Sequence, residues 1–425
     1  MHEHRLTELD SGVRVVTEAM PSVRSAALGF FVGTGSRAED EAQAGLSHLL
    51  EHLLFRGSAR YASLEIDQIF DGMGAELNAG TGKESTSVYA RVLDRHLPQA
   101  FDVISDIVWR PRLDDLDAER AVVLEEIAMY EDDPQDKVFD VLGAAVFGEH
   151  PLGRSIIGRA EVIAETPREA IFDFHRARYV PSNVVIAASG SVDHDDLVRM
   201  AREHGSDAGG ARPEAPEAPA ELGASVRFES KDTEQYHVCL GAPGLARDDD
   251  RRFALRVLDN VLGGTSSSRL FQEVRERRGL AYAVYSFTAH YAHTGQVGVY
   301  LGTRGENLGE ALEVVAVELE KARELPASET ELQRSKENVK GRLVLSLEST
   351  TTRMNRLGSS VLGEVPLLSV DELIERVDAV TLDDLGELVA DLYAAPRLSA
   401  AGIGPDEEAF QRALEPIGPV AAGAA

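Results

Sequence analysis

Two histidines and a glutamate in the segment His48-Leu-Leu-Glu-His52 have the types and spacing of a metal site. The segment is predicted to be helical from about Ala42 to Phe55. Residues four apart lie on one face of a helix about a turn apart, so His48 and His52 would project side by side, as two ligands of one tetrahedral zinc ion must. Glu51 would lie on the adjoining strip of the helix, where its carboxylate could act as a general base on a water molecule.

The order of these three residues is the inverse of the commoner His-Glu-x-x-His zinc helix, and it is typical of the inverted class of zinc peptidases. Histidine is scarce in this chain, with 12 in 425 residues, so chance rarely produces this spacing around a glutamate. The alternative interpretation is an amphipathic helix with surface histidines and no metal.

A third ligand is predicted from a second acidic segment. A catalytic zinc site usually has three protein ligands and leaves the fourth position to water. Glu119 and Glu126 are seven residues apart, and two carboxylates at this spacing share one face of a helix. We assign Glu126 as the third ligand. Glu119 is assigned as a residue that does not bind the metal but orients a ligand or the metal-bound water. The alternative is a solvated acidic helix, because further acidic residues follow closely in the same segment.

The elements that must carry these residues occur twice along the chain. Residues 209–224 are rich in glycine, proline, alanine and glutamate and are predicted to link a first half, residues 1–208, to a second half, residues 225–425. Each half opens with alternating, strand-like segments and continues with a helix, further strands and long amphipathic helices. This order predicts an α+β fold made of two homologous α/β sandwich halves.

Only the first copy keeps the metal-binding residue types. When the copies are aligned by eye, to within one residue, the positions opposite the three ligands are occupied by Arg256, Asn260 and Arg342. A structural frame needs only volume and patterning, whereas a metal site needs particular ligands. The sequence therefore predicts one Zn2+ per chain, held by the first half.

Composition narrows the classes of function. The chain has 72 acidic and 43 basic residues and a net charge of −29, which argues against nucleic-acid binding. The charge indicates a self-repelling, soluble surface, with an acidic chamber that attracts basic peptides as the alternative. One cysteine, Cys239, allows no intrachain disulfide. The acidic N-terminal residues are unlike a signal peptide and no apolar stretch has the length of a membrane span, so we expect a cytoplasmic protein without membrane contact.

Taken together, these segments resemble the pitrilysin, insulinase and mitochondrial-processing-peptidase family of zinc peptidases, especially its short two-half members. The similarity covers nearly the whole chain. It includes the His48–His52 segment and the position of Glu126, 74 residues after His52. It also includes four further segments, at residues 78–86, 150–158, 179–192 and 270–282.

The resemblance implies properties that the residue spacing does not show. It implies that the two halves form a clamshell around a peptide chamber, and that the chain forms a homodimer or a heterodimer with a homologous chain. It implies peptide or unfolded-segment substrates, and a contribution of Arg275 and Tyr282 to the substrate site. Without the resemblance, Arg275 would be interpreted as part of a basic helix end and Tyr282 as a core aromatic residue.

The resemblance also implies a strand that binds the substrate backbone. In this chain the matching residues are Asn78, Ala79, Gly80 and Thr81. The segment is richer in glycine than the family's usual strand, and glycine weakens a strand while admitting close backbone approach. The preference among substrates is therefore left open.

The predicted function is a zinc-dependent endopeptidase in which Glu51 is the general base. One alternative is a non-catalytic scaffold or partner subunit of the same fold. Such a chain would be expected to lack metal-site residues, but this sequence retains His48, Glu51, His52 and Glu126. A structural zinc protein would usually fill four positions with cysteines. A serine or cysteine hydrolase would need a nucleophile motif that the sequence does not contain.

Overall fold

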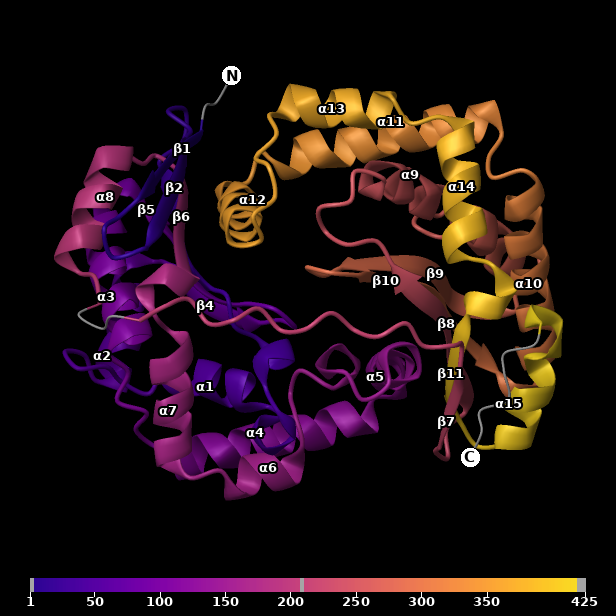
Figure 1. Ribbon diagram of the computed structural model, residues 1–425, viewed down its shortest axis with the longest axis horizontal. Coiled ribbons are helices and arrows are strands. Elements are labelled where there is room, and N and C mark those ends of the chain that lie inside the picture. Colours follow the sequence, from indigo (N-terminus) through magenta and orange to yellow (C-terminus); the bar gives the residue numbers. More distant parts are fainter. Residues whose placement is uncertain (1–3, 207–209, 419–425) are drawn as a thin grey trace. The chain divides into compact units, whose positions relative to one another are not determined.

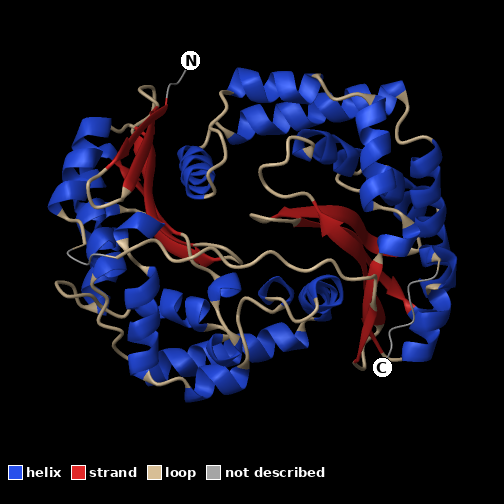
Figure 2. Cartoon of the chain, viewed as in Figure 1, coloured by secondary structure: helices blue, strands red, loops and turns tan. Residues whose placement is uncertain are grey.

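The computed structural model describes residues 4–206 and 210–418, and it contains two β-sheets covered by helices (Figures 1 and 2). The contacts within the chain define two compact units. Unit 1 comprises Met1–Ala128, Ser155–Glu217 and Val344–Ser369. Unit 2 comprises Met129–Arg154, Ala218–Leu343 and Val370–Ala425. Within the described ranges, no helix combines the length and the apolar character that crossing a membrane requires.

Unit 1 is built on a six-stranded sheet with the order β1-β2-β6-β3-β5-β4. The strands are β1 (His4–Glu8), β2 (Arg14–Ala19), β3 (Ser25–Val32), β4 (Glu76–Thr81), β5 (Thr86–Leu93) and β6 (Val184–Gly190). Strands β2 and β6 run parallel, and the other neighbours run antiparallel. Strand β4 is therefore an edge of this sheet.

Alternate residues of β3 face two different layers, as the two-residue period of a strand requires. Leu28 and Phe30 pack into a core with the helices on one face of the sheet. Ala27 and Phe31 pack on the other face against α12 (Thr350–Leu362). The helices of the first layer are α1 (Leu46–Leu54), α2 (Ser63–Met73), α3 (Leu97–Trp109), α4 (Leu116–Asp132), α6 (Ala160–Glu165), α7 (Arg168–Arg178) and α8 (His194–Glu203).

Unit 2 repeats this topology with one strand fewer. Its sheet has the order β7-β11-β8-β10-β9, with β7 and β11 parallel and the other neighbours antiparallel. The strands are β7 (Val226–Ser230), β8 (Gln235–Gly244), β9 (Ala281–His290), β10 (Gly295–Arg304) and β11 (Ser399–Gly404). The helices are α5 (Pro134–Phe147), α9 (Arg252–Leu262), α10 (Leu308–Glu324), α11 (Glu329–Ser346), α13 (Val370–Asp378), α14 (Leu382–Leu392) and α15 (Glu407–Ala413). The matching strand orders confirm the predicted α+β fold and its two halves.

The two halves of the chain exchange one helix each. Helix α5 follows α4 in the chain and packs on β7, β8 and β11 of the second sheet. Its counterpart α12 follows α11 and packs on β2, β3 and β6 of the first sheet, beside which it is drawn in Figure 1. The compact units therefore depart from a linear division of the chain at these two helices. The predicted boundary at residues 208 and 209 lies outside the described residues, and residues 210–225 contain no helix or strand.

Helix α12 is held on the first sheet by close packing and by a buried ion pair. A Cβ atom added to Gly358 would lie 2.3 Å from the ring of Phe31, so the helix backbone lies close to the strands. The guanidinium group of Arg353 pairs with the carboxylate of Glu18 on β2 and also donates to the carbonyl oxygen of Leu347. Because an unpaired buried charge is costly, these contacts fix the position of α12 on the sheet.

A buried histidine in unit 1 predicts a pH dependence of stability. The Nε2 atom of His175 on α7 lies 2.9 Å from the carbonyl oxygen of Val108, and burial lowers the pKa of this imidazole to about 4, below its ordinary value of about 6.5. The unfolded ring binds more protons than the folded one between these values, so the free energy of unfolding should decrease as the pH falls from about 6.5 to about 4. In His175→Gln this decrease should be smaller by up to about 2–3 kcal/mol. Urea unfolding at several pH values would measure the difference, and an unchanged pH dependence would contradict the prediction.

Candidate metal centre

The helix that carries the two histidines is shorter than predicted. The predicted span from Ala42 to Phe55 is wrong at its start, because the structure has a short 3-10 turn at Glu41–Gln43 and begins α1 at Leu46. The interruption is at Gly45, whose φ of 102° is a left-handed conformation that favours glycine. A Cβ atom at this position would lie 2.8 Å from the carbonyl oxygen of Ile157.

A buried carboxylate binds the first turn of α1. The two side-chain oxygens of Glu39 accept hydrogen bonds from the backbone N–H groups of Gly45, at 2.8 Å, and Ser47, at 2.7 Å. The first N–H groups of a helix have no partner within the helix, and the positive end of the helix dipole favours an anion there. Glu39 thereby fixes the turn from which His48 projects.

Helix α1 has one apolar face and one polar face. The apolar face consists of five leucines that are at most 1% exposed: Leu46, Leu49, Leu50, Leu53 and Leu54. They follow the i, i+3, i+4, i+7, i+8 spacing of a helix face buried in a core. His48, Glu51 and His52 lie between these positions; the two histidines contact α4, and Glu51 contacts β4.

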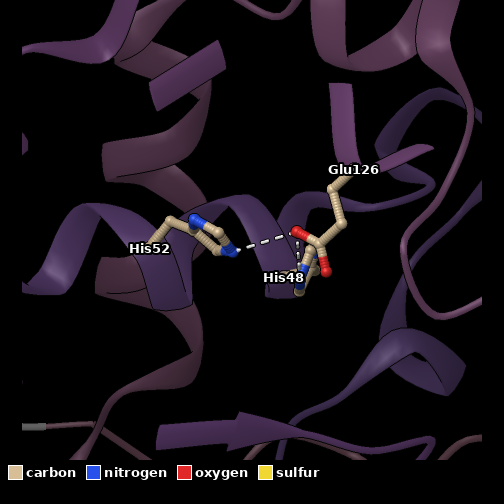
Figure 3. A group of neighbouring side chains, drawn as sticks. All are labelled: His48, His52 and Glu126. Atoms are coloured by element: carbon tan, nitrogen blue, oxygen red, sulfur yellow. Dashed lines mark ion pairs between the residues drawn. The ribbon is translucent and has the colours of Figure 1, made fainter. Parts of the chain in front are cut away.

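The structure brings His48, His52 and Glu126 together in one group (Figure 3). The Oε2 atom of Glu126 on α4 lies 3.6 Å from Nε2 of His48 and 3.5 Å from Nε2 of His52. In residues 4–206 and 210–418 this is the one group of three such side chains whose ligand atoms all lie within 4.8 Å of one another.

The spacing of these atoms fits a metal ion better than a hydrogen bond. An N–H···O hydrogen bond has a donor–acceptor distance of about 2.7–3.2 Å. The ligands of a tetrahedral zinc ion, at about 2.0–2.1 Å from the metal, are about 3.3–3.4 Å from one another. Two imidazole nitrogens and one carboxylate oxygen also form a donor set that zinc commonly uses. The group can therefore hold a divalent metal ion and leave one position open.

Glu119 lies beside this group, on the opposite side of the His52 ring from Glu126. Its Oε2 atom is 3.3 Å from Nδ1 of His52, and its other oxygen pairs with Arg56 just after α1. The carboxylate of Glu119 is buried, with 4% of its side chain exposed. A carboxylate in this position fixes the ring so that Nε2 is directed toward Glu126.

Burial shifts the pKa values of His48 and Glu51, two residues on the polar face of α1. It lowers the pKa of His48, an effect that the nearby carboxylate of Glu126 partly opposes. The neutral imidazole is the form that binds a metal ion. Burial also raises the pKa of the Glu51 carboxyl, and a hydrogen bond from Thr81 partly opposes this. A raised pKa makes a carboxylate a stronger base.

The four residues of the predicted substrate strand form most of β4, at the edge of the first sheet. Asn78 and Gly80 are exposed, whereas Ala79 and Thr81 are partly buried on the side toward α1. The hydroxyl group of Thr81 donates to Oε2 of Glu51. This contact is not predictable from the sequence, because no local pattern relates a strand residue to a helix residue 30 positions earlier.

Arg275 and Tyr282 form a stacked pair in unit 2. The guanidinium carbon of Arg275, on the helical segment Phe271–Glu276, lies 4.4 Å from the centre of the Tyr282 ring. Its Nη1 atom donates to the carbonyl oxygen of Tyr282 at 3.0 Å. Tyr282 is 79% exposed on the edge strand β9, so it is not a core aromatic residue.

Comparisons with known proteins identify the family of this chain. A family model described as insulinase (peptidase family M16) matches residues 14–160, and one described as peptidase M16 inactive domain matches residues 166–339. An uncharacterized zinc protease of Streptomyces coelicolor is 42% identical over 416 residues, which are 95% of this chain and 91% of that protein. The chain belongs to peptidase family M16, the insulinase family. This confirms the family predicted from the sequence.

Two further comparisons give a similar sequence and a similar fold. An uncharacterized zinc protease of Mycobacterium tuberculosis is 43% identical over 408 residues, 94% of this chain and 93% of the relative. A solved structure of a peptidase M16 inactive domain from Pseudomonas fluorescens has a TM-score of 0.89 at 24% identity and covers 95% of this chain and 98% of that one. The second comparison shows that the fold is shared.

The contact between Glu39 and α1 predicts a stability effect. Replacing Glu39 with alanine leaves two buried N–H groups at the start of α1 without their acceptor, which should lower the free energy of unfolding by about 1–3 kcal/mol. Asp40→Ala is a matched control, because Asp40 accepts from Ala42 at the exposed turn before α1 and its loss should cost less than about 1 kcal/mol. Urea unfolding of both variants would measure the effects, and equal losses would contradict the assigned role of Glu39.

Proposed function

We propose that this M16 chain is a zinc-dependent endopeptidase that holds one zinc ion with His48, His52 and Glu126. The observation that carries the proposal is the pair of 3.5 and 3.6 Å separations between the imidazole nitrogens and one carboxylate oxygen. With zinc held there, the site would have a Lewis acid that could polarise the scissile carbonyl and make a water molecule more acidic. The relatives named as zinc proteases support the same metal.

Glu51 is proposed as the general base. It precedes His52 on the polar face of α1, and burial raises the pKa of its carboxyl. Its carboxylate would take a proton from the attacking water and deliver a proton to the leaving amine. Glu119 would keep the ring of His52 in a fixed orientation through its contact with Nδ1.

The substrate is proposed to bind as an extended peptide along β4. In the described sheet β4 pairs with β5 on one side, and the other edge offers backbone N–H and C=O groups to an added strand. Main-chain hydrogen bonds of this kind give affinity with little dependence on sequence. The family resemblance supports a role for unit 2, in which the exposed Tyr282 hydroxyl donates to the developing oxyanion and Arg275 supports its ring.

A catalytic role is favoured over a scaffold of the same fold, because all four of the residues required for chemistry are present and three of them meet in one group. In unit 2 the corresponding helices α9 and α11 are instead joined by an amide contact, from Nδ2 of Asn260 to Oδ1 of Asn338 at 2.9 Å. This supports one metal site per chain. The dimer and the cytoplasmic location implied by the sequence stay predictions.

Removal of the metal is the first test of this function. The purified protein should contain one zinc ion per chain, lose peptide cleavage when a chelator removes the metal, and recover it with one equivalent of zinc. Elemental analysis and cleavage of an unstructured peptide would measure both properties. Two tightly bound zinc ions per chain, or full activity in the metal-free protein, would contradict the proposal.

Substitution of the base tests the role of Glu51. Glu51→Gln keeps the size of the side chain but cannot accept the proton, so kcat should fall by about 10²–10⁴-fold while the zinc content stays the same. Glu125→Gln is the matched control, because it makes the same change at an exposed position next to Glu126 and should keep full activity. Near-normal turnover in Glu51→Gln would assign the base elsewhere, and loss of zinc would make Glu51 a ligand.

A further inference from the structure

The side chain of Thr81 connects the proposed substrate strand to the proposed base. Thr81 is the last residue of β4, opposite Thr86 of β5, and is partly buried. Its hydroxyl group donates to Oε2 of Glu51 and lies 3.4 Å from the carbonyl oxygen of Ser47. A hydroxyl group has one proton to donate, and a bond to a carboxylate is stronger than a bond to a neutral carbonyl group. The contact with Glu51 is therefore the one that determines the orientation of the hydroxyl.

We propose that Thr81 is a positioning residue for peptide hydrolysis, whose hydroxyl group holds the Glu51 carboxylate in the orientation that accepts the proton of the attacking water. This rests on the proposed function. A glutamate side chain on a helix has three rotatable bonds, so its carboxylate adopts several orientations unless a contact selects one. A base must be held close to its productive geometry, because a displacement of about 1 Å can cost on the order of 100-fold in rate.

Thr81, which contacts the proposed base, belongs to the strand that is proposed to bind the substrate. Helix α1 supplies the base and two of the three proposed ligands, whereas Thr81 comes from the strand along which the substrate would bind. The carboxylate is thus aligned by the same backbone segment that aligns the peptide. A substrate bound in the correct register on β4 would therefore meet a base that already has the matching orientation.

Unit 2 contains a contact of the same kind without metal-binding residues. The hydroxyl group of Ser286 on β9 donates to Oδ1 of Asp259 on α9 at 2.6 Å. Asp259 occupies the position opposite Glu51 when the two halves are aligned. A hydroxyl on the edge strand can therefore fix an acid on the neighbouring helix by itself, and a purely structural role for Thr81 must be distinguished by experiment.

Two substitutions at Thr81 separate the hydroxyl from the packing of the side chain. Thr81→Val keeps the shape and removes the hydroxyl, whereas Thr81→Ser keeps the hydroxyl and removes a methyl group. If Thr81 positions the base, Thr81→Val should lower kcat by about 10–100-fold with KM changed less than about 3-fold, and Thr81→Ser should keep most of kcat. Zinc content should equal that of the wild type in both variants.

Thr7→Val is the matched control. Thr7 lies on β1, at the opposite edge of the same sheet, and its hydroxyl group contacts Nε2 of His194 at 2.9 Å. This variant also removes an edge-strand hydroxyl that contacts a polar side chain, and it should keep the wild-type kcat.

The outcomes that overturn the inference are distinct. A Thr81→Val variant with normal kcat, or a Thr81→Ser variant that is the more impaired of the two, would assign Thr81 to packing. An increase confined to KM would make it a substrate-binding residue, and loss of zinc would make it a support of the ligand helix. A wild-type protein that binds zinc but cleaves no peptide would overturn the proposed function itself, and the role of Thr81 with it.

Discussion

The buried leucine face of α1 is the constraint on which the rest of the candidate site depends. Burial of each leucine side chain stabilises the fold by about 1.5–3 kcal/mol, whereas an exposed ion pair contributes about 0–1 kcal/mol. Packing therefore decides how α1 is rotated about its axis, and the polar contacts follow from that rotation. Because the leucines occupy one face, His48, Glu51 and His52 are placed together on the other. Glu39 and Gly45 then determine where along its axis the helix starts.

The charges around the two histidines suit a dication. Three carboxylates, those of Glu51, Glu119 and Glu126, lie within this small region, and Arg56 pairs with one of them. Burial lowers the pKa of His48 and so disfavours a positive charge on this ring. Glu119 is buried, and a buried carboxylate is costly unless a cation or hydrogen-bond donors compensate it. A zinc ion at the three ligand atoms would supply that compensation while a fourth position stays open to water.

The two units share a fold but differ at the positions of the candidate metal-site residues. The five strands of the second sheet follow the order of β2-β6-β3-β5-β4 in the first, and each sheet is covered by a helix from the other half of the chain. In unit 2 the acid at the position of Glu51 is Asp259, whose burial raises the pKa of its carboxyl to about 6. The hydroxyl–acid contact between helix and edge strand is retained there, but Asn260, at the position of His52, donates to Asn338 on α11. Suitable side-chain volumes and hydrogen bonds are enough to maintain the fold, and unit 2 retains both.

Local periodicity made several features of this protein predictable from the sequence. The four-residue spacing of His48 and His52 places both rings on one side of any helix, whatever surrounds it. The seven-residue spacing of Glu119 and Glu126 does the same for the two acids, and the repeated order of strands and helices reveals the duplication. These patterns depend on the geometry of a single element, which the chain encodes in consecutive residues.

Contacts between distant segments were decided only by the tertiary structure. The start of α1 at Leu46 depends on how closely Gly45 approaches the backbone of Ile157, and the exchange of α5 and α12 depends on which sheet face each can cover. The sequence contains both histidines and Thr81, but no periodic pattern brings Thr81 to Glu51. The types and spacing of the candidate ligands were thus properties of the sequence, whereas the orientation of the proposed base required the packing of a strand against a helix.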